Sequence, residues 1–159
     1  MLLTTPRLRL CLAAPPFDPS AFDWITDAPG PGVWELAGIA ARAAEVEWYL
    51  PPWGLYVIVR TSDERAVGGI GFHGPPGPNG EVEIGYELAP AARGAGYATE
   101  AVRALAALAL DSPDVRAVTA RTIRDNTASQ AVLLRCGFAR VPIPPPDGMT
   151  HFRLTHPPA

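Results

Sequence analysis

The sequence predicts one mixed α/β domain built on a central, largely antiparallel sheet that is flanked by helices. Two observations predict it. Short segments alternate apolar and polar residues, as strands with one buried face do. Longer segments with helical character lie between them, as in domains where helices cover a sheet. With 159 residues, of which 48% are hydrophobic, the chain has about the size of one domain. No internal repeat or linker divides it, so we expect residues 1–159 to form a single domain.

Alternating and short apolar runs predict seven strands. We expect them at Arg7–Leu12, Tyr56–Arg60, Ala66–Phe72, Glu81–Leu88, Val115–Thr122, Phe138–Ile143 and Met149–Thr155. The polar residues 61–65 join the second and third of these as a hairpin. In Glu81–Leu88 the apolar side chains share one face and the three glutamates share the other.

Three regions are predicted to be helical. They are residues 20–50, interrupted at Pro29–Gly32 and resuming from Trp34 to Leu50, the segment from Tyr97 to Leu110, and a segment that ends at Cys136. Asn126 is a suitable N-cap for the last helix, because its side chain can accept from a free backbone N–H. Gly137 is suited to end that helix in a left-handed conformation.

The basic residues exclude some functions. All 13 are arginine, so a Walker A phosphate loop and Schiff-base chemistry on a lysine are both excluded. Residues 115–143 hold five arginines and one acid, while the whole chain has a net charge of −3. Such a local positive field suggests an anionic ligand, although a solvated surface explains it equally well. The overall negative charge argues against a nucleic-acid partner.

We expect a soluble, cytoplasmic protein without a membrane or metal partner. The first residues lack a charged region followed by an apolar core, so no signal peptide is predicted. The longest apolar stretch, Ala104–Leu110, is too short to span a bilayer. Cys11 and Cys136 allow one bridge at most, and their spacing suggests neither a metal site nor a disulfide framework.

The most informative feature is the Gly-rich turn Arg93–Ala98, which lies between a predicted strand and a predicted helix. The N-terminus of a helix carries free N–H groups and a positive dipole, and it therefore binds phosphate. The alternative is an ordinary turn with a solvated Arg93. A Rossmann turn is disfavoured, because Thr99 stands where the third glycine belongs and the preceding strand alternates instead of being continuously apolar.

Here the sequence resembles the GNAT acetyltransferases, and in particular their RimJ/RimL-like branch. Arg93-x-x-Gly96-x-Ala98 is similar to the phosphate loop of that family. The flanking Glu-Ile-Gly-Tyr-x-Leu and Gly-Tyr-Ala-Thr-Glu-Ala also match, as do the run from Asn126 to Phe138 and the opening Leu3-x-Thr5-x-Arg7-Leu-x-Leu10. Cys11 departs from the arginine common in the branch, and residues 24–50 are short for acceptor-side helices.

The resemblance implies acetyl transfer from acetyl-CoA to an amine by direct attack in a ternary complex, with no metal. It also implies a V-shaped splay between the strands near 81–88 and 115–122, in which the pantetheine arm lies. The cofactor-binding residues it implies are Leu88, Ala89, Arg93, Gly94, Ala95, Gly96, Tyr97, Ala98, Thr99 and Asn126. Leu88 and Ala89 would offer backbone groups to the arm, and Asn126 its amide. The phosphates of CoA would meet Arg121, Arg124 and Arg135.

For the chemistry, the resemblance implies that Glu83 takes the amine proton and that Ser129 protonates the departing thiolate. Tyr97 is a second hydroxyl donor. His73 lies just after a strand and could reach the cleft. Ordinary structural roles compete with these: for Ser129 a helix serine bonded to its own backbone, for Glu83 an exposed strand carboxylate, and for His73 a surface loop.

Two acceptor classes fit, a protein N-terminal α-amine and a small-molecule amine. A non-catalytic acyl-CoA-binding module and a nucleotide-binding Rossmann module are the alternative functions. A homodimer is left open.

Overall fold

The computed structural model describes residues 1–14, 18–25 and 51–157. The predicted helical break at Pro29–Gly32 and the helix from Trp34 to Leu50 lie outside the described residues. Before that gap the chain forms a 3-10 turn, η1 (Pro19–Ala21), in which Asp18 accepts from the N–H of Ser20.

Eight strands form one sheet in the order β1-β2-β3-β4-β5-β6-β8-β7. They are β1 (Leu2–Thr4), β2 (Leu8–Leu12), β3 (Leu55–Arg60), β4 (Arg65–Phe72), β5 (Glu81–Leu88), β6 (Ala117–Ile123), β7 (Ala139–Arg140) and β8 (Met149–Thr155). All neighbours are antiparallel except β5 and β6, which are parallel. The predicted mixed, mostly antiparallel sheet is therefore confirmed.

Some strand boundaries differ from the predictions. Strand β1 was not predicted, because its three residues are too few to show an alternating pattern. The expected strand Phe138–Ile143 is reduced to β7, since prolines follow within residues 142–146 and proline cannot donate to a ladder. Strand β6 starts two residues later than expected.

Two α-helices, α2 (Tyr97–Leu110) and α3 (Thr127–Arg135), and a 3-10 turn, η2 (Pro90–Ala92), complete the described fold. The Oδ1 of Asn126 accepts from the N–H of Ser129 at 3.0 Å, as expected of an N-cap. Gly137 has a φ of 90°, which confirms the predicted left-handed stop.

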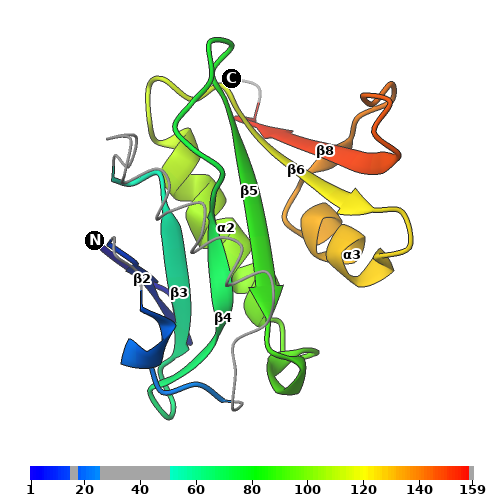
Figure 1. Cartoon of the computed structure of the whole chain (residues 1–159). Helices are drawn as coiled ribbons and strands as arrows, with labels where there is room; N and C mark the ends of the chain where they lie inside the picture. The colour runs from blue at the N-terminus through cyan, green and yellow to red at the C-terminus, as the bar shows by residue number, and fades with distance from the viewer. Residues whose placement is uncertain (15–17, 26–50, 158–159) are drawn as a thin grey trace.

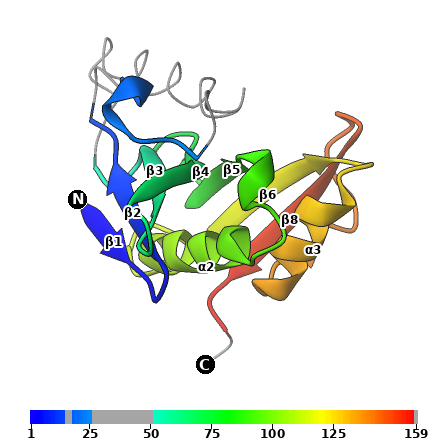
Figure 2. The same ribbon diagram turned by 90° about the horizontal axis from the view of Figure 1, so that it is seen from below.

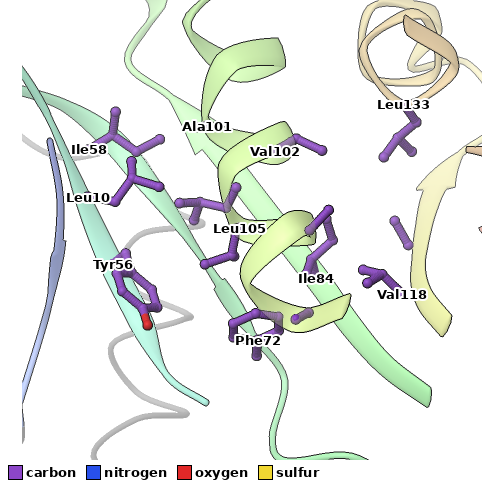
Figure 3. Packing of buried hydrophobic residues seen from close by; sticks show 14 of the residues in the cluster. Leu10, Tyr56, Ile58, Phe72, Ile84, Ala101, Val102, Leu105, Val118 and Leu133 are labelled. Carbon is purple, nitrogen blue, oxygen red and sulfur yellow. The ribbon is translucent and has the colours of Figure 1, made fainter. Parts of the chain in front are cut away.

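The core lies between α2 and one face of the sheet, as Figures 2 and 3 show. On β3, Tyr56 and Ile58 face this core, and Leu105 of α2 reaches it from the other side with no exposed surface. The intervening Val57 and Val59 pack against Trp24 on the opposite face. This alternation fixes which strand positions are covered by α2 and which face away from it.

The pairing of β5 with β6 is short. It runs only from Glu81 opposite Ala117 to Glu83 opposite Thr119. Beyond this point β5 stays paired with β4 as far as Leu88, while β6 stays paired with β8. The two strands consequently diverge, as Figure 1 shows. The predicted V-shaped splay is present, and it leaves backbone groups on facing strand edges without a strand partner.

Candidate active site at the splayed strands

The turn between β5 and α2 carries a row of backbone donors. Gly94 and Gly96 adopt φ angles of 81° and 82°, which L side chains rarely adopt. Both glycines are exposed. The N–H groups from Gly94 through Thr99 donate to none of the described residues, and the first intrahelical bond of α2 comes from the N–H of Glu100 to Gly96. This is the geometry of a phosphate-binding helix N-terminus.

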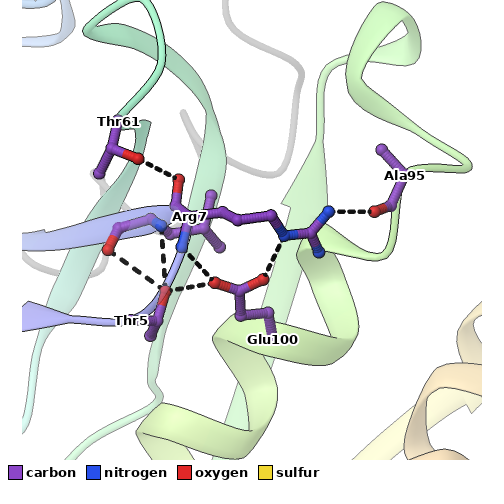
Figure 4. A network of polar contacts seen from close by, with 6 residues as sticks. Thr5, Arg7, Thr61, Ala95 and Glu100 are labelled. Atoms are coloured by element: carbon purple, nitrogen blue, oxygen red, sulfur yellow. Dashed lines mark hydrogen bonds and ion pairs between the residues drawn. The ribbon is translucent and has the colours of Figure 1, made fainter.

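Arg7, from the start of the chain, fixes the far side of this turn. Its Nη1 donates to the carbonyl oxygen of Ala95 at 2.8 Å, and its Nε donates to Glu100 at 2.8 Å (Figure 4). In a trans peptide the carbonyl and the following N–H point in opposite directions. Arg7 therefore directs the N–H of Gly96 away from itself and toward the open side of the turn.

Glu100 ties the same turn to the loop after β1. One of its oxygens accepts from the hydroxyl of Thr5 at 2.6 Å and from the backbone N–H of Arg7 at 2.8 Å. Burial raises the pKa of this carboxyl, but the hydrogen bonds from Thr5 and Arg7 outweigh burial and hold the pKa below its ordinary value. Glu100 is therefore ionised at neutral pH. No local sequence signal linked these residues to the turn, because Thr5 and Arg7 lie far from Glu100 along the chain.

An open groove of about 810 Å³ lies beside Gly96. Its lining comes from the loop after β1, from α2 and from the end of α3: Thr4, Thr5, Pro6, Arg7, Gly96, Thr99, Glu100, Arg103, Ala104 and Arg135. Three of these are arginines and one is an acid, so the groove favours an anion. Arg135 was expected to meet an anionic ligand; Arg7 and Arg103 were missed, since they lie outside the arginine-rich segment.

Alternate residues of β5 face the gap with their backbone groups. The backbone carbonyl of Glu83 accepts from the backbone N–H of His73, and the N–H of Ala89 donates to the carbonyl of Val67 at 2.8 Å. The backbone groups of the odd-numbered residues therefore point to β4. Tyr86 and Leu88 therefore direct their N–H groups toward β6, beyond the point where pairing ends. The carbonyl of Leu88 also accepts from the Nε of Arg93 at 3.2 Å.

Ala89 directly follows β5, and its backbone groups already have partners. Its N–H is taken by Val67, and its carbonyl already accepts from the N–H of Ala92 at 2.9 Å. The N–H of Ala89 is thus used by β4 and its carbonyl by η2. Leu88 retains a free donor on the gap, whereas Ala89 does not.

Ser129 lies at the start of α3 beside a tyrosine that sequence reasoning did not single out. The hydroxyl of Tyr86 lies 2.7 Å from the Oγ of Ser129 and donates to the carbonyl of Ser129 at 3.1 Å. Burial raises the pKa of Tyr86 to about 12, although the contact with Ser129 opposes this. Tyr86 thus keeps its proton at neutral pH, and the two hydroxyls form a pair between β5 and α3.

The other expected side chains have different neighbours. Tyr97 lies under the guanidinium of Arg7, 4.8 Å from the ring centroid, so it belongs to the phosphate turn and not to the Ser129 pair. Asn126 uses its Oδ1 as the helix cap, and its amide nitrogen has no partner among the described residues. The capping role therefore leaves the donor half of the amide available.

Glu83 lies on the face of β5 that turns away from α2. Its Oε1 is 2.7 Å from the Nε of Arg121 and 3.3 Å from the Nδ1 of His73. Burial raises the pKa of Glu83, but hydrogen bonds from His73 and Arg121 outweigh it and hold the pKa below its ordinary value. Arg121 is thereby paired with a carboxylate on this face.

Comparison with known proteins assigns the family. A family model described as an acetyltransferase (GNAT) domain matches residues 9–139. Because this match covers most of the chain, the chain belongs to the GNAT acetyltransferase family, and the resemblance seen in its motifs is confirmed. The uncharacterized N-acetyltransferase YjdG of Bacillus subtilis (strain 168) is 40% identical over 83 residues, which are 52% of this chain and 49% of YjdG. The chain spans about half the length of the curated relatives it matches.

Solved structures share the fold. An acetyltransferase from Agrobacterium tumefaciens str. C58 superposes with a TM-score of 0.71 at 24% identity, covering 98% of this chain and 95% of that one. RimL, described as a ribosomal L7/L12 α-N-protein acetyltransferase in complex with coenzyme A, gives 0.65 at 17% identity and covers 98% of both chains. At these identities the likeness establishes the architecture alone.

The described part of the chain has neither a metal-binding cluster nor a membrane-spanning helix. No cluster of three or more His, Cys, Asp or Glu side chains there could hold a metal ion. No helix there is long and apolar enough to cross a membrane.

Proposed function

We propose that this protein transfers an acetyl group from acetyl-CoA to a primary amine, by direct attack of the amine on the thioester. The observation that carries the proposal is the placement of a phosphate-type turn at the open end of the gap between β5 and β6. A ligand with phosphates at one end and a long, thin arm fits this arrangement, because the N–H groups of Gly94 to Thr99 and the gap are adjacent.

In this proposal the pyrophosphate of CoA accepts from the N–H groups of the turn. The arm runs along β5, where the N–H of Leu88 meets it, and the free amide nitrogen of Asn126 reaches it from α3. Arg103 and Arg135 supply positive charge in the groove beside Gly96. The role of Arg93 is indirect, since its Nε already donates to Leu88.

The leaving group departs toward the hydroxyl pair. When the amine attacks, the C–S bond breaks and sulfur takes up negative charge. A hydroxyl that donates to this sulfur lowers the barrier, as positioned acids do. We assign this role to Ser129. Tyr86 supports it, since its hydroxyl lies 2.7 Å from the Oγ of Ser129 and holds that side chain between β5 and α3.

For the acceptor we propose an α-amine in preference to a lysine side chain. An α-amino group has a pKa near ~8 and a lysine near ~10.4, so removing the proton at neutral pH is easier by about 3 kcal/mol for the α-amine. We further propose that residues 1–159 act as one domain and that the protein works in the cytoplasm.

The test is release of free thiol from acetyl-CoA in the presence of N-terminal peptides, amino acids, polyamines and aminoglycosides in turn. Amine-dependent release supports the proposal. Binding of CoA without release with any amine would instead identify a non-catalytic acyl-CoA-binding module of the same fold, which is the second candidate.

A further inference from the structure

We propose that His73 is the group that removes the proton from the acceptor amine, and that Glu83 is the residue that positions it. The inference rests on the proposed acetyl transfer and names the base for that reaction. The family resemblance implied Glu83 itself as the base, and it left His73 either near the cleft or in a surface loop.

The backbone and side chain of His73 are both held against β5. The residue directly follows the end of β4, and its N–H donates to the carbonyl of Glu83 at 2.9 Å. Its Nδ1 lies 3.3 Å from the Oε1 of Glu83. Two contacts to one residue fix the ring, while 33% of the His73 side chain stays exposed. A fixed but accessible imidazole is suited to exchange a proton with a bound molecule.

Gly85 leaves room for the imidazole ring. A Cβ built at this position would lie 2.8 Å from the Nε2 of His73, closer than real side chains approach. A side chain at this position would therefore require the ring to move from its present place. Gly85 follows Glu83 by two residues and shares its face of β5, so the Nε2 lies just past the point where β5 and β6 stop pairing.

The contact with Glu83 selects the tautomer. An ionised carboxylate only accepts hydrogen bonds, so the Nδ1 of His73 must carry the proton. In the neutral ring the Nε2 then keeps its lone pair, and this nitrogen has no hydrogen-bond partner within the described ranges. A ring nitrogen with a free lone pair, oriented by a carboxylate on the other nitrogen, is the arrangement of a general base.

Glu83 is the weaker candidate for the base. The Oε1 that contacts His73 also accepts from Arg121 at 2.7 Å, and this ion pair stabilises the charged carboxylate. Arg121 also lies 3.8 Å from Asp147, which in turn contacts the Nε2 of His151 at 2.7 Å. The charged groups around Glu83 therefore hold it in place as an anion and lower its tendency to take up a proton.

The base and the acid lie on opposite faces of the sheet. His73 and Glu83 face away from α2, whereas Tyr86 belongs to the alternate set of β5 side chains and reaches Ser129 of α3. A thioester held in the gap would be attacked from the face of His73 and would lose its sulfur toward Ser129.

The protons and electrons balance in this scheme. The acceptor ammonium gives one proton to the Nε2 of His73, which becomes an imidazolium stabilised by Glu83 and later returns the proton to solvent. The nitrogen lone pair forms the C–N bond, and the C–S bond breaks with its electrons going to sulfur. Ser129 protonates the sulfur and is reprotonated by the second proton lost from nitrogen. The products are the acetamide and free CoA.

The test compares His73→Ala with wild type, using whichever amine in the thiol-release panel gives the highest kcat/KM. We expect His73→Ala to lower kcat by on the order of 10²–10⁴-fold, with acetyl-CoA affinity unchanged in calorimetry. Added free imidazole should restore part of kcat, because it can enter the space over Gly85. Gly85→Ala should lower kcat with the histidine still present, and His156→Gln, an exposed histidine near the C-terminus, should have no effect.

The outcomes separate the two proposals. A wild-type protein that releases no thiol with any amine overturns the proposed function, and this inference with it. An active wild type whose His73→Ala variant keeps full kcat, gains nothing from imidazole or loses acetyl-CoA binding along with kcat overturns only the role of His73.

Discussion

The guanidinium of Arg7 donates to the carbonyl oxygen of Ala95 across 88 positions of sequence, at 2.8 Å. This bond joins the loop after β1 to the turn that opens α2. The conformation of the phosphate turn is therefore fixed from outside as well as by its own glycines.

Arg7→Gln should accordingly weaken acetyl-CoA binding. The substitution removes the bonds of the guanidinium to both Ala95 and Glu100. Because one hydrogen bond to a charged group contributes about 1.5–3 kcal/mol, we expect a roughly tenfold to hundredfold higher Kd in calorimetry. Arg9→Gln is the matched control, because Arg9 lies two residues further on and pairs with Glu64 instead. Equal affinity of wild type and Arg7→Gln would show that the turn holds its shape unaided.

Gly96→Val should abolish measurable binding of CoA. The residue has a φ of 82°, and a Cβ there would lie 3.3 Å from the Nη2 of Arg7. The added side chain would both strain the backbone and change the direction of the N–H groups. Gly148→Val is the control for strain alone, since Gly148 has a φ of 75° and a Cβ added to it would meet no atom within 4 Å. A folded Gly96→Val protein with wild-type affinity would contradict the phosphate assignment.

Ser129→Ala should lower kcat by on the order of 10²–10⁴-fold, as expected for a positioned acid, with little change in the Kd of acetyl-CoA. Tyr86→Phe should also lower kcat, but less, because it removes only the group that orients Ser129. Steady-state kinetics with calorimetry on the same samples distinguishes these effects. A loss confined to acetyl-CoA binding would make Ser129 a cofactor contact, and no loss would leave it an ordinary helix serine.

Glu100→Gln should destabilise the protein at neutral pH and lose that effect in acid. The folded-state pKa of Glu100 is lowered, so the carboxylate stabilises the fold above the ordinary glutamate pKa of about 4.3. This contribution disappears as pH falls through the folded-state value. Urea unfolding of wild type and Glu100→Gln should therefore give free energies that converge on acidification. Free energies that stay equally far apart at all pH values would show that Thr5 and Arg7 contribute nothing through the charge of Glu100.

Local signals in the sequence predicted the parts of the fold that depend on neighbouring residues. Helix α2 runs from Tyr97 to Leu110 as predicted, because a glycine precedes it and its apolar residues repeat with the helical period. The alternation in Glu81–Leu88 correctly separated a buried face from a face that carries Glu83. The short run Phe138–Ile143 was overestimated, since its prolines limit pairing.

The contacts that complete the site could not be predicted in this way. Arg7 reaches Ala95, Tyr86 reaches Ser129 and Arg121 reaches Glu83 only because the sheet brings distant segments together. The arginine-rich segment shows the limit of charge counting. Arg121 and Arg135 both belong to it, yet one pairs with a carboxylate on the face away from α2 and the other lines the groove beside Gly96.

The most direct test of the proposed function follows the acetyl group itself. Wild-type protein is incubated with acetyl-CoA that carries an isotopically labelled acetyl group and with a peptide that has a free α-amine and one lysine, and the peptide is then sequenced by mass spectrometry. We predict label on the α-nitrogen, in a one-to-one ratio with free thiol, and little on the lysine. Thiol release without labelled peptide, or no release despite bound acetyl-CoA, would contradict acetyl transfer to an amine.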